Sequence, residues 1–199
     1  MIFYFIIYIL KKQNIAHSNL DYTPTTIIFV SSKERASQKE KQLKPALIMG
    51  YNIVLIEPEI PNNTGNIGRL SLASGSTLHL VKPFGFEIDD SRVKRAGLDY
   101  WKHISLHVYE SIEEFYEINS NKKMVYLSSH AEKNYCSIDY EDDLFLVFGK
   151  ESAGLPDSII SKNPNKLYKI PIHSKHIRSL NLANSVSIVV YEGLRVLNT

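Results

Sequence analysis

From residue 51 onward, short apolar runs alternate with segments in which apolar residues recur every three or four positions. Uninterrupted apolar runs of about five residues predict strands that are buried on both faces. We expect such strands at 52–56, 77–81, 123–127, 144–148 and 166–170, and the run at 104–108 has the same character. The three-to-four spacing predicts helices at 64–74, 90–96, 112–119, 156–161 and 180–197. Alternation of this kind predicts an α/β domain whose mostly parallel sheet is flanked by helices.

The expected helix ends have chemical support at two places. Asn62 and Asn63 are good capping residues for the helix at 64–74, and Gly75 is a good terminator. The last helix has an apolar stripe at Leu182, Val186, Val189, Val190, Gly193 and Leu197, with Leu180, Ile188, Tyr191 and Leu194 on other sides. A helix that is apolar nearly all round is buried on both faces, and a domain this small has few layers to cover it. We therefore expect a homodimer through this helix, and a charge at Val190 to break the interface or the fold.

Residues 1–48 differ in character from the rest of the 199-residue chain. They hold seven Lys+Arg against three Asp+Glu, and all nine glycines lie at or after Gly50. Ten apolar residues open the chain and Lys11-Lys12 follow, which is the reverse of a signal peptide and too short a run to span a bilayer. We interpret 1–48 as a poorly ordered extension, with translation starting at Met49, and 49–199 as the functional domain.

Composition narrows the class of protein. The chain is 44% hydrophobic and 22% charged, which is ordinary for a globular domain. Its single cysteine, Cys136, forms neither an internal disulfide nor a cysteine-rich zinc site, and this favours a cytoplasmic location without a membrane partner. Residues 49–199 hold 16 Lys+Arg and 18 Asp+Glu, so any nucleic-acid contact must come from a local patch.

Common cofactor and catalytic motifs are missing from the sequence. It contains no G-x-G-x-x-G, no G-x-x-x-x-G-K-[ST], no H-E-x-x-H and no G-x-S-x-G. His103 and His107 lie near a predicted strand, where their spacing suits a single metal ion poorly, and we predict no metal site. We interpret the acids at 57 and 59 and the histidines at 173 and 176 as solvated loop residues.

Three polar stretches lie where predicted strands end. They span 61–69 (PNNTGNIGR), 148–156 (FGKESAGLP) and 170–182, which contains RSLNL. In open α/β sheets, ligands bind beyond the carboxyl ends of the strands, where small residues let backbone amides approach them. Each stretch alone is explained by a capped helix start. Together they predict a composite ligand site.

These stretches resemble the ordered motifs of the SPOUT methyltransferases, which are knotted RNA-modifying enzymes. The resemblance covers essentially all of 51–199. The segments 57–61 (EPEIP), 63–66 (NTGN) and 95–101 (RAGLDYW) resemble in particular the small tRNA 2′-O-methyltransferases of the anticodon wobble nucleotide, cytidine or uridine. The resemblance implies a deep trefoil knot near the carboxyl end, S-adenosyl-L-methionine as methyl donor, no metal, and a homodimer whose active sites are completed across the interface.

The resemblance also implies roles for individual residues. The cofactor slot is lined by Leu127, Gly149, Ile170, Ser179 and Leu180. Arg69 is the catalytic residue near the target hydroxyl, and Asn63 holds Arg69 or the ribose in place. Glu151 fixes the second motif or meets the substrate, and Asn181 is a further substrate contact.

The chemistry of the guanidinium group limits the roles that Arg69 can have. A guanidinium is effectively always protonated, so it serves poorly as a base. We expect Arg69 to bind phosphate as a fork and to orient the hydroxyl, while a carboxylate or the phosphate takes the proton.

The substrate patch is expected just before an aromatic pair. Arg92, Lys94 and Arg95 precede Tyr100 and Trp101, and cations beside aromatic rings suit a single-stranded RNA loop. A solvated helix face followed by a buried Trp is the other interpretation.

Two alternative functions stay open at this point. One is a related SPOUT 2′-O-methyltransferase for another tRNA position or for rRNA. The other is a non-catalytic RNA-binding module, although Asn63, Arg69, Gly149 and Ser179 are all intact.

Overall fold

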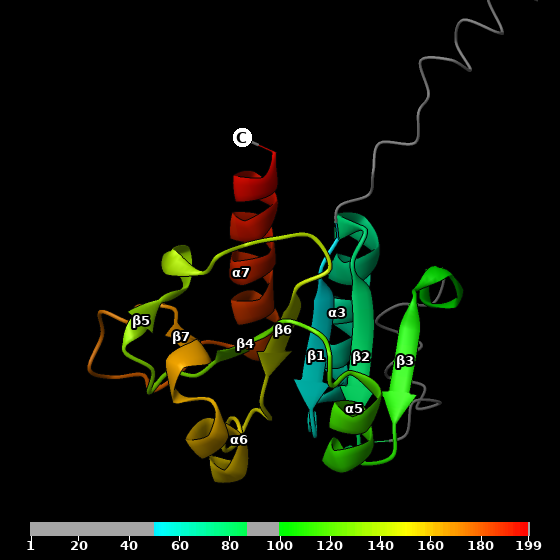
Figure 1. The fold of residues 1–199 in the computed structure, drawn as a ribbon, viewed down its shortest axis with the longest axis horizontal. Coiled ribbons are helices and arrows are strands. Elements are labelled where there is room, and N and C mark those ends of the chain that lie inside the picture. Colours follow the sequence, from blue (N-terminus) through cyan, green and yellow to red (C-terminus); the bar gives the residue numbers. More distant parts are fainter. Residues whose placement is uncertain (1–49, 87–99, 199) are drawn as a thin grey trace, which may run out of the picture. The chain divides into compact units, whose positions relative to one another are not determined.

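A computed structural model describes residues 50–86 and 100–198. Within these ranges the chain forms a seven-stranded sheet in which every pairing is parallel (Figure 1). The strands are β1 (Asn52–Ile56), β2 (Thr77–Val81), β3 (Leu106–Tyr109), β4 (Met124–Leu127), β5 (Lys133–Asn134), β6 (Phe145–Phe148) and β7 (Leu167–Lys169). Their order across the sheet is β3-β2-β1-β6-β4-β7-β5. The α/β class with a parallel sheet is therefore confirmed.

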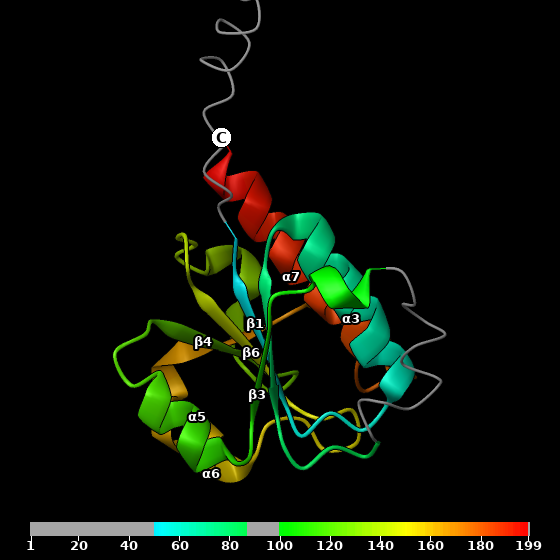
Figure 2. The ribbon, with the colours of Figure 1, turned by 90° about the vertical axis from the view of Figure 1, so that its right-hand side faces the viewer.

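Helices cover both faces of this sheet. The α-helices are α3 (Pro61–Ser74), α5 (Ile112–Ile118), α6 (Asp157–Lys162) and α7 (Leu182–Leu197), and short 3₁₀ turns lie at Trp101–His103, Tyr135–Ser137 and Pro164–Lys166. Figure 2 shows α3 and α7 on one side of the sheet and α5 and α6 on the other. The described residues contain no helix that is long and apolar enough to cross a membrane.

Alternate side chains of the central strands build two cores. On the α3–α7 face, Ile53 and Leu55 of β1 pack with Ile67 and Val186. On the other face, Val54 and Ile56 pack with residues such as Phe115 of α5 and Ile159 of α6. Because both faces of β1 are covered, all five of its residues are buried, as its unbroken apolar run predicts.

The start of α3 differs from the sequence prediction. The helix begins at Pro61, one turn earlier than expected, and Asn62 and Asn63 lie inside it instead of capping it. Proline suits the first helical position because its missing N–H has no helical partner there anyway. The end is as predicted, with Gly75 in the left-handed conformation at φ 68°.

Most other boundaries shift by only one or two residues. The elements that the sequence did not predict lie near the edge of the sheet, where a 3₁₀ turn at Pro164–Lys166 precedes β7 and where β5 is an additional strand. A two-residue strand has no periodicity to detect. The helix expected at 90–96 and the extension at 1–48 lie outside the described residues.

Helix α7 confirms its apolar stripe. Leu182, Val186, Val189, Val190 and Gly193 are all buried in this single chain. Val190 is fully buried against the sheet, so a charge at Val190 should break the fold, and a role of this helix in an interface stays a prediction. Ile188, Tyr191 and Val196 are the exposed large apolar residues of the helix, at 37%, 53% and 36%. The trefoil knot implied by the resemblance stays a prediction.

Candidate active site

A pocket of about 840 Å³ lies beyond the carboxyl ends of four neighbouring strands. Its walls come from the segments that follow β1, β6, β4 and β7, together with the chain that leads into α7. Its size is within the range of about 300–1,000 Å³ that is usual for small-molecule and cofactor sites. The composite site predicted from the three polar stretches is therefore a real concavity.

All five residues predicted to bind the cofactor line this pocket. Leu127, Gly149, Ile170, Ser179 and Leu180 come from four different parts of the chain. Leu127, Ile170 and Leu180 give the pocket apolar surface, and Ser179 adds a hydroxyl. Further polar side chains, such as Ser128 and Ser185, also line the pocket, and a lining with both apolar and polar groups fits a nucleoside such as that of S-adenosyl-L-methionine.

Gly149 is required by a close approach of two backbone segments. A Cβ at this position would overlap the backbone of Gly154 and Leu155. The two arms of the loop are joined by hydrogen bonds between Lys150 and Gly154, at 3.2 and 2.8 Å. The loop after β6 is thus a tight hairpin at the rim of the pocket.

Glu151 connects the second polar stretch to the first. One carboxylate oxygen accepts a hydrogen bond from Glu59 N at 2.8 Å, and the other accepts from Ile60 N at 3.3 Å and Asn63 Nδ2 at 2.9 Å. The carboxylate therefore accepts hydrogen bonds from backbone N–H groups just before α3, which have no partner within the helix. Of the two roles predicted for Glu151, the structure places it in the first, as a link that fixes the loops.

Two further contacts join the same loops. Lys150 Nζ lies 3.0 Å from Glu57 Oε2, and both side chains are largely buried. Glu59 accepts hydrogen bonds from Ser152 N and Ser152 Oγ, which lower the pKa of its carboxyl. The interpretation of both acids as solvated is therefore wrong. Glu57 also has a positive φ of 51°, a conformation that a non-glycine residue adopts only when its surroundings hold it there.

The third polar stretch is tied to the first through a pair of amides. Asn181 Nδ2 donates to Asn63 Oδ1 at 2.9 Å, while Asn181 Oδ1 accepts from Asn184 N and caps α7. The Asn63 side chain is 5% exposed, and both ends of its amide are engaged. Asn63 thus joins Glu151 and Asn181 in one connected site.

Arg69 lies apart from this cluster. It is exposed on α3, six residues and about 120° around the helix from Asn63, and it is not among the described residues that line the pocket. Its guanidinium carbon lies 4.8 Å from the centre of the Tyr100 ring, and Tyr100 Oη donates to Gly65 O at 3.1 Å. Trp101 packs against Gly68, where a Cβ would collide with the indole. The aromatic pair thus supports α3, and a contact of Tyr100 with substrate stays a prediction.

The remaining candidates fall into two groups. Arg92, Lys94 and Arg95 lie outside the described residues. His103, His107, His173 and His176 are exposed, as expected. Within the described ranges, no three His, Cys, Asp or Glu side chains gather as ligands for a metal ion.

Comparison with known proteins shows the family to which the chain belongs. The model of the SpoU rRNA methylase family matches residues 50–191, which include all three polar stretches. The chain belongs to the SpoU methylase family. A relative from Listeria monocytogenes is 47% identical over 153 residues, which cover 75% of this chain and 90% of the relative. The tRNA (cytidine(34)-2′-O)-methyltransferase of Escherichia coli K12 is 42% identical over 147 residues, which cover 73% of this chain and 93% of the enzyme.

Solved structures of the family share the fold. One that concerns 2-OH methylation of C/U34 on tRNA has a TM-score of 0.72 at 36% identity, and the match covers 76% of this chain and 98% of that chain. An AdoMet-bound rRNA methyltransferase from Sinorhizobium meliloti has a TM-score of 0.67 at 26% identity, and the match covers 74% of this chain and 57% of that chain. The sheet and flanking helices of this SpoU methylase are thus those of SPOUT methyltransferases.

Sequence reasoning missed the residues that hold the loops together. Lys150 and Ser152 were not singled out, although each lies beside Glu151 and faces an acid of the first polar stretch. The sequence does contain complementary groups, because the acids at 57 and 59 can pair with the cation at 150 and the hydroxyl at 152. These pairs can be predicted only when β1 and β6 are known to be neighbours in the sheet.

Proposed function

We propose that this chain is a tRNA 2′-O-methyltransferase that methylates the ribose of nucleotide 34, cytidine or uridine, in the anticodon loop. The observation that carries the proposal is the match to the Escherichia coli enzyme, which extends over 93% of that enzyme. The family match at residues 50–191 includes every polar stretch around the pocket. The structure with 36% identity, concerned with C/U34, supports the same substrate.

S-adenosyl-L-methionine is the proposed methyl donor, and when bound it supplies an electrophilic methyl group for in-line transfer to a ribose hydroxyl. Its nucleoside fits the apolar surface of Leu127, Ile170 and Leu180, and Gly149 in the same pocket lets the loop after β6 close tightly, because no side chain separates it from Gly154. The contribution of the protein is then mostly to position the hydroxyl in line with the methyl group.

We further infer that the carboxylates of the site are positioning groups. Glu151 accepts three hydrogen bonds, Glu59 accepts two, and Glu57 pairs with Lys150. The hydrogen bonds from Ser152 lower the pKa of the Glu59 carboxyl, which makes it a weaker base. We assign to Arg69 the role of a fork that binds a substrate phosphate and orients the target hydroxyl.

The proposed enzyme is a homodimer. Its interface would include the exposed apolar residues of two adjacent helices, Leu72 on α3 and Ile188 and Tyr191 on α7. Arg69 does not line the pocket of its own chain, and a dimer would explain how it can still act in catalysis. Arg69 of one protomer would then serve the pocket of its partner.

A charge on this face tests the dimer. Tyr191→Glu should convert the protein to folded monomers, because an unpaired charge in an apolar interface is costly and Tyr191 is half exposed in the single chain. Sedimentation velocity measures the change. Ile118→Glu is the matched control, since Ile118 is 62% exposed on α5, on the other face of the sheet. A Tyr191→Glu protein with unchanged mass would contradict the proposed interface.

We propose residues 49–199 as the methyltransferase domain, because the family match begins at residue 50. A cytoplasmic location follows from the proposed substrate and stays a prediction.

The decisive test of the function is a nucleotide-resolution map of 2′-O-methylation. Purified protein, S-adenosyl-L-methionine and unmodified tRNA should yield a methyl group at nucleotide 34 and at no other position. A product at another tRNA position or in rRNA would replace this proposal with that of a related enzyme. Failure to bind the cofactor would favour the non-catalytic RNA-binding module.

The role of Arg69 is tested by Arg69→Ala. We expect methyl transfer to fall by about 100-fold or more, because an interaction made mainly in the transition state is lost, while cofactor affinity stays within about twofold. Single-turnover rates and calorimetric titration separate the two effects. Lys123→Ala is the control, since Lys123 is exposed just before β4 and pairs with the nearby Asp139 and Glu141. Equal losses of rate and cofactor affinity would contradict the assignment.

A further inference from the structure

The segments on the two sides of the pocket differ in charge. The loops after β1 and β6 form one wall and contain three acids, Glu57, Glu59 and Glu151, beside one cation, Lys150. The opposite wall belongs to residues 158–191, a stretch of the sequence without a single Asp or Glu. Its cationic residues are Lys162, Lys166, Lys169, Lys175 and Arg178, and it also holds His173 and His176. In a chain with 21 acids, this stretch is an unusual concentration of positive charge.

This stretch borders the pocket directly. Tyr168 lines the pocket from β7, Ile170, Ile172 and Arg178 line it from the segment that follows, and Ile160 lines it from α6. Figure 1 shows β7 beside β5, the edge strand opposite β3. Arg178 thus lies at the pocket, Lys175 lies between the lining residues Ile172 and Arg178 in the chain, and Lys166 comes two positions before the lining residue Tyr168.

The cations of this side differ from lysines elsewhere in the described structure. Lys82, Lys122, Lys123 and Lys150 each lie within 4.0 Å of a carboxylate. Lys166 and Lys175 are exposed, and within the described residues neither has a carboxylate at ion-pair distance. Positive charge that is not neutralised within the protein is available to an external anion.

We propose that Lys166, Lys175 and Arg178 form a phosphate-binding rim, which holds the backbone of the RNA substrate beside the pocket. This inference rests on the proposed function and adds the direction from which RNA approaches. A nucleic-acid backbone is repelled by the acidic wall and attracted by the rim, so the RNA enters over β7 and the segment that follows it. Binding at the rim should not depend on the RNA sequence, because contacts to phosphates position the RNA and do not distinguish its bases.

The double variant Lys166→Gln/Lys175→Gln tests the rim without changing a residue that lines the pocket. We expect the Kd for an anticodon stem–loop RNA to rise roughly tenfold, and the slope of log K against log salt to fall by about 1.4, since each lost contact to single-stranded RNA is worth about 0.7. The affinity for S-adenosyl-L-methionine and the rate at saturating RNA should be unchanged. Fluorescence anisotropy at several salt concentrations measures the Kd.

The matched control is Lys122→Gln/Lys123→Gln, which removes the same charge from exposed lysines at the amino end of the sheet. Equal losses in both double variants would show a general charge effect and overturn the rim. A rim variant with wild-type affinity and salt slope would also overturn it, while methylation at nucleotide 34 would leave the proposed function intact. If wild-type protein binds RNA through the rim but methylates none, only the proposed function fails. Competition by polyglutamate as strong as by RNA of equal charge would replace RNA with an acidic protein partner and overturn the proposal.

Discussion

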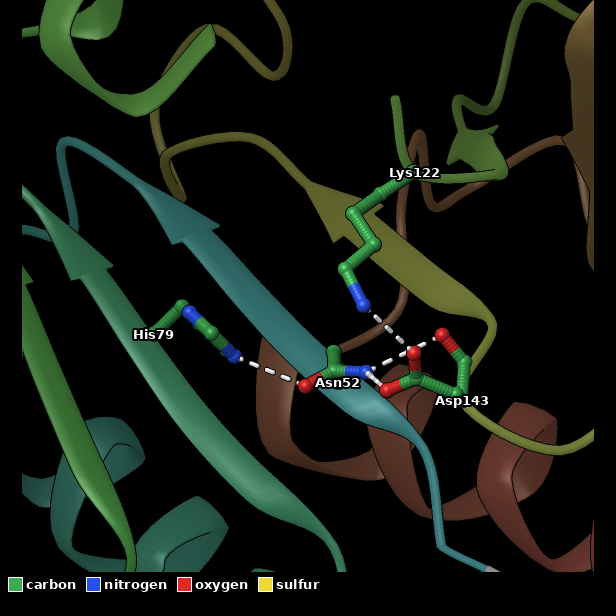
Figure 3. A network of polar contacts seen from close by, with 4 residues as sticks. All are labelled: Asn52, His79, Lys122 and Asp143. Carbon is green, nitrogen blue, oxygen red and sulfur yellow. Dashed lines mark hydrogen bonds and ion pairs between the residues drawn. The ribbon is translucent and has the colours of Figure 1, made fainter. Parts of the chain in front are cut away.

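The two ends of the same parallel sheet both collect polar side chains, but they use them differently. At the carboxyl ends of β1, β6, β4 and β7, the polar groups stand around an open pocket of about 840 Å³. Near the amino ends, polar groups are joined to one another within the packed structure (Figure 3). Similar residue types thus form a binding site at one end and a structural network at the other. The difference is whether a cavity remains beside them.

The network near the amino ends is a directional chain of hydrogen bonds. Asn52 Nδ2 donates to the Asp143 backbone and side-chain oxygens at 3.0 and 2.7 Å, which leaves Asn52 Oδ1 to accept from His79 Nε2 at 2.9 Å. His79 Nδ1 is then the acceptor for Tyr109 Oη, also at 2.9 Å. Lys122 closes the chain on the outer oxygen of Asp143 at 2.8 Å. In this arrangement each nitrogen of a neutral imidazole has its proper partner.

Burial explains why His79 stays neutral. The side chain is 4% exposed, and desolvation, assisted by the nearby His107, lowers its pKa to about 4. Its ring lies 5.0 Å from that of His107 and 5.1 Å from that of Phe145. The carboxylate of Glu151, by contrast, lines the open pocket. The two ends should therefore respond differently to pH and to substitution.

The largest expected effect is acid destabilisation through His79. In the unfolded chain His79 takes up a proton near pH 6.5, whereas in the folded chain it does so only near pH 4. The unfolded state thus binds more protons in this window, and the free energy of unfolding should fall by about 3 kcal/mol as pH drops from 6.5 to 4. Denaturation at several pH values should show this loss in the wild type and a much smaller one in His79→Gln.

His176→Gln is the control for that experiment, since His176 is exposed in a loop. Asp143 contributes at lower pH only, because its pKa is lowered by Lys122 and Asn52, so its stabilisation is lost below the unfolded value. Parallel stability curves for wild type and His79→Gln would show that the network does not control the acid response.

A smaller effect is expected from exchanging a carboxylate for an amide at each end. Glu151→Gln should slow methyl transfer by about 30-fold, roughly 2 kcal/mol, because an amide cannot accept all three hydrogen bonds that hold Asn63 and the start of α3. Its melting temperature should change little. Asp143→Asn should do the reverse, with lower stability and an unchanged rate.

Single-turnover assays and thermal melts on the same two proteins measure this contrast. Glu151→Gln protein with full activity would remove Glu151 from the positioning role. Asp143→Asn protein with a tenfold slower reaction would show that the two ends of the sheet are coupled.

The smallest effect is expected at the exposed margin of the network. Lys122→Met should cost less than about 1 kcal/mol of stability, because Lys122 and Asp143 are 41% and 62% exposed and water screens the pair. Chemical denaturation of both single variants and the double variant gives the coupling energy between the two residues. A coupling energy above about 2 kcal/mol would show that the exposed Lys122–Asp143 pair stabilises the fold as strongly as a buried interaction does.

The amino-acid sequence determined much of the fold by local chemistry. Unbroken apolar runs specified the central strands because these strands are covered on both faces, and Gly75 specified the end of α3 because a left-handed residue is needed there. The ordered polar stretches also identified the site, and all five residues expected around the cofactor line one pocket. The sequence did not predict the strand β5, because two residues are too few to show a periodic pattern. It also did not predict that α3 begins at Pro61, because this helix has no side-chain cap.

Only the tertiary structure decided which polar residues meet. Glu57 and Glu59 lie about 90 positions from Lys150 and Ser152, and they come together because β1 and β6 are neighbours in the sheet. The same adjacency explains the link from Asn52 to Asp143, while that from His79 to Asn52 depends on β1 and β2. Local patterns report burial and backbone conformation, but the pairing of distant side chains depends on strand order, which no local pattern contains.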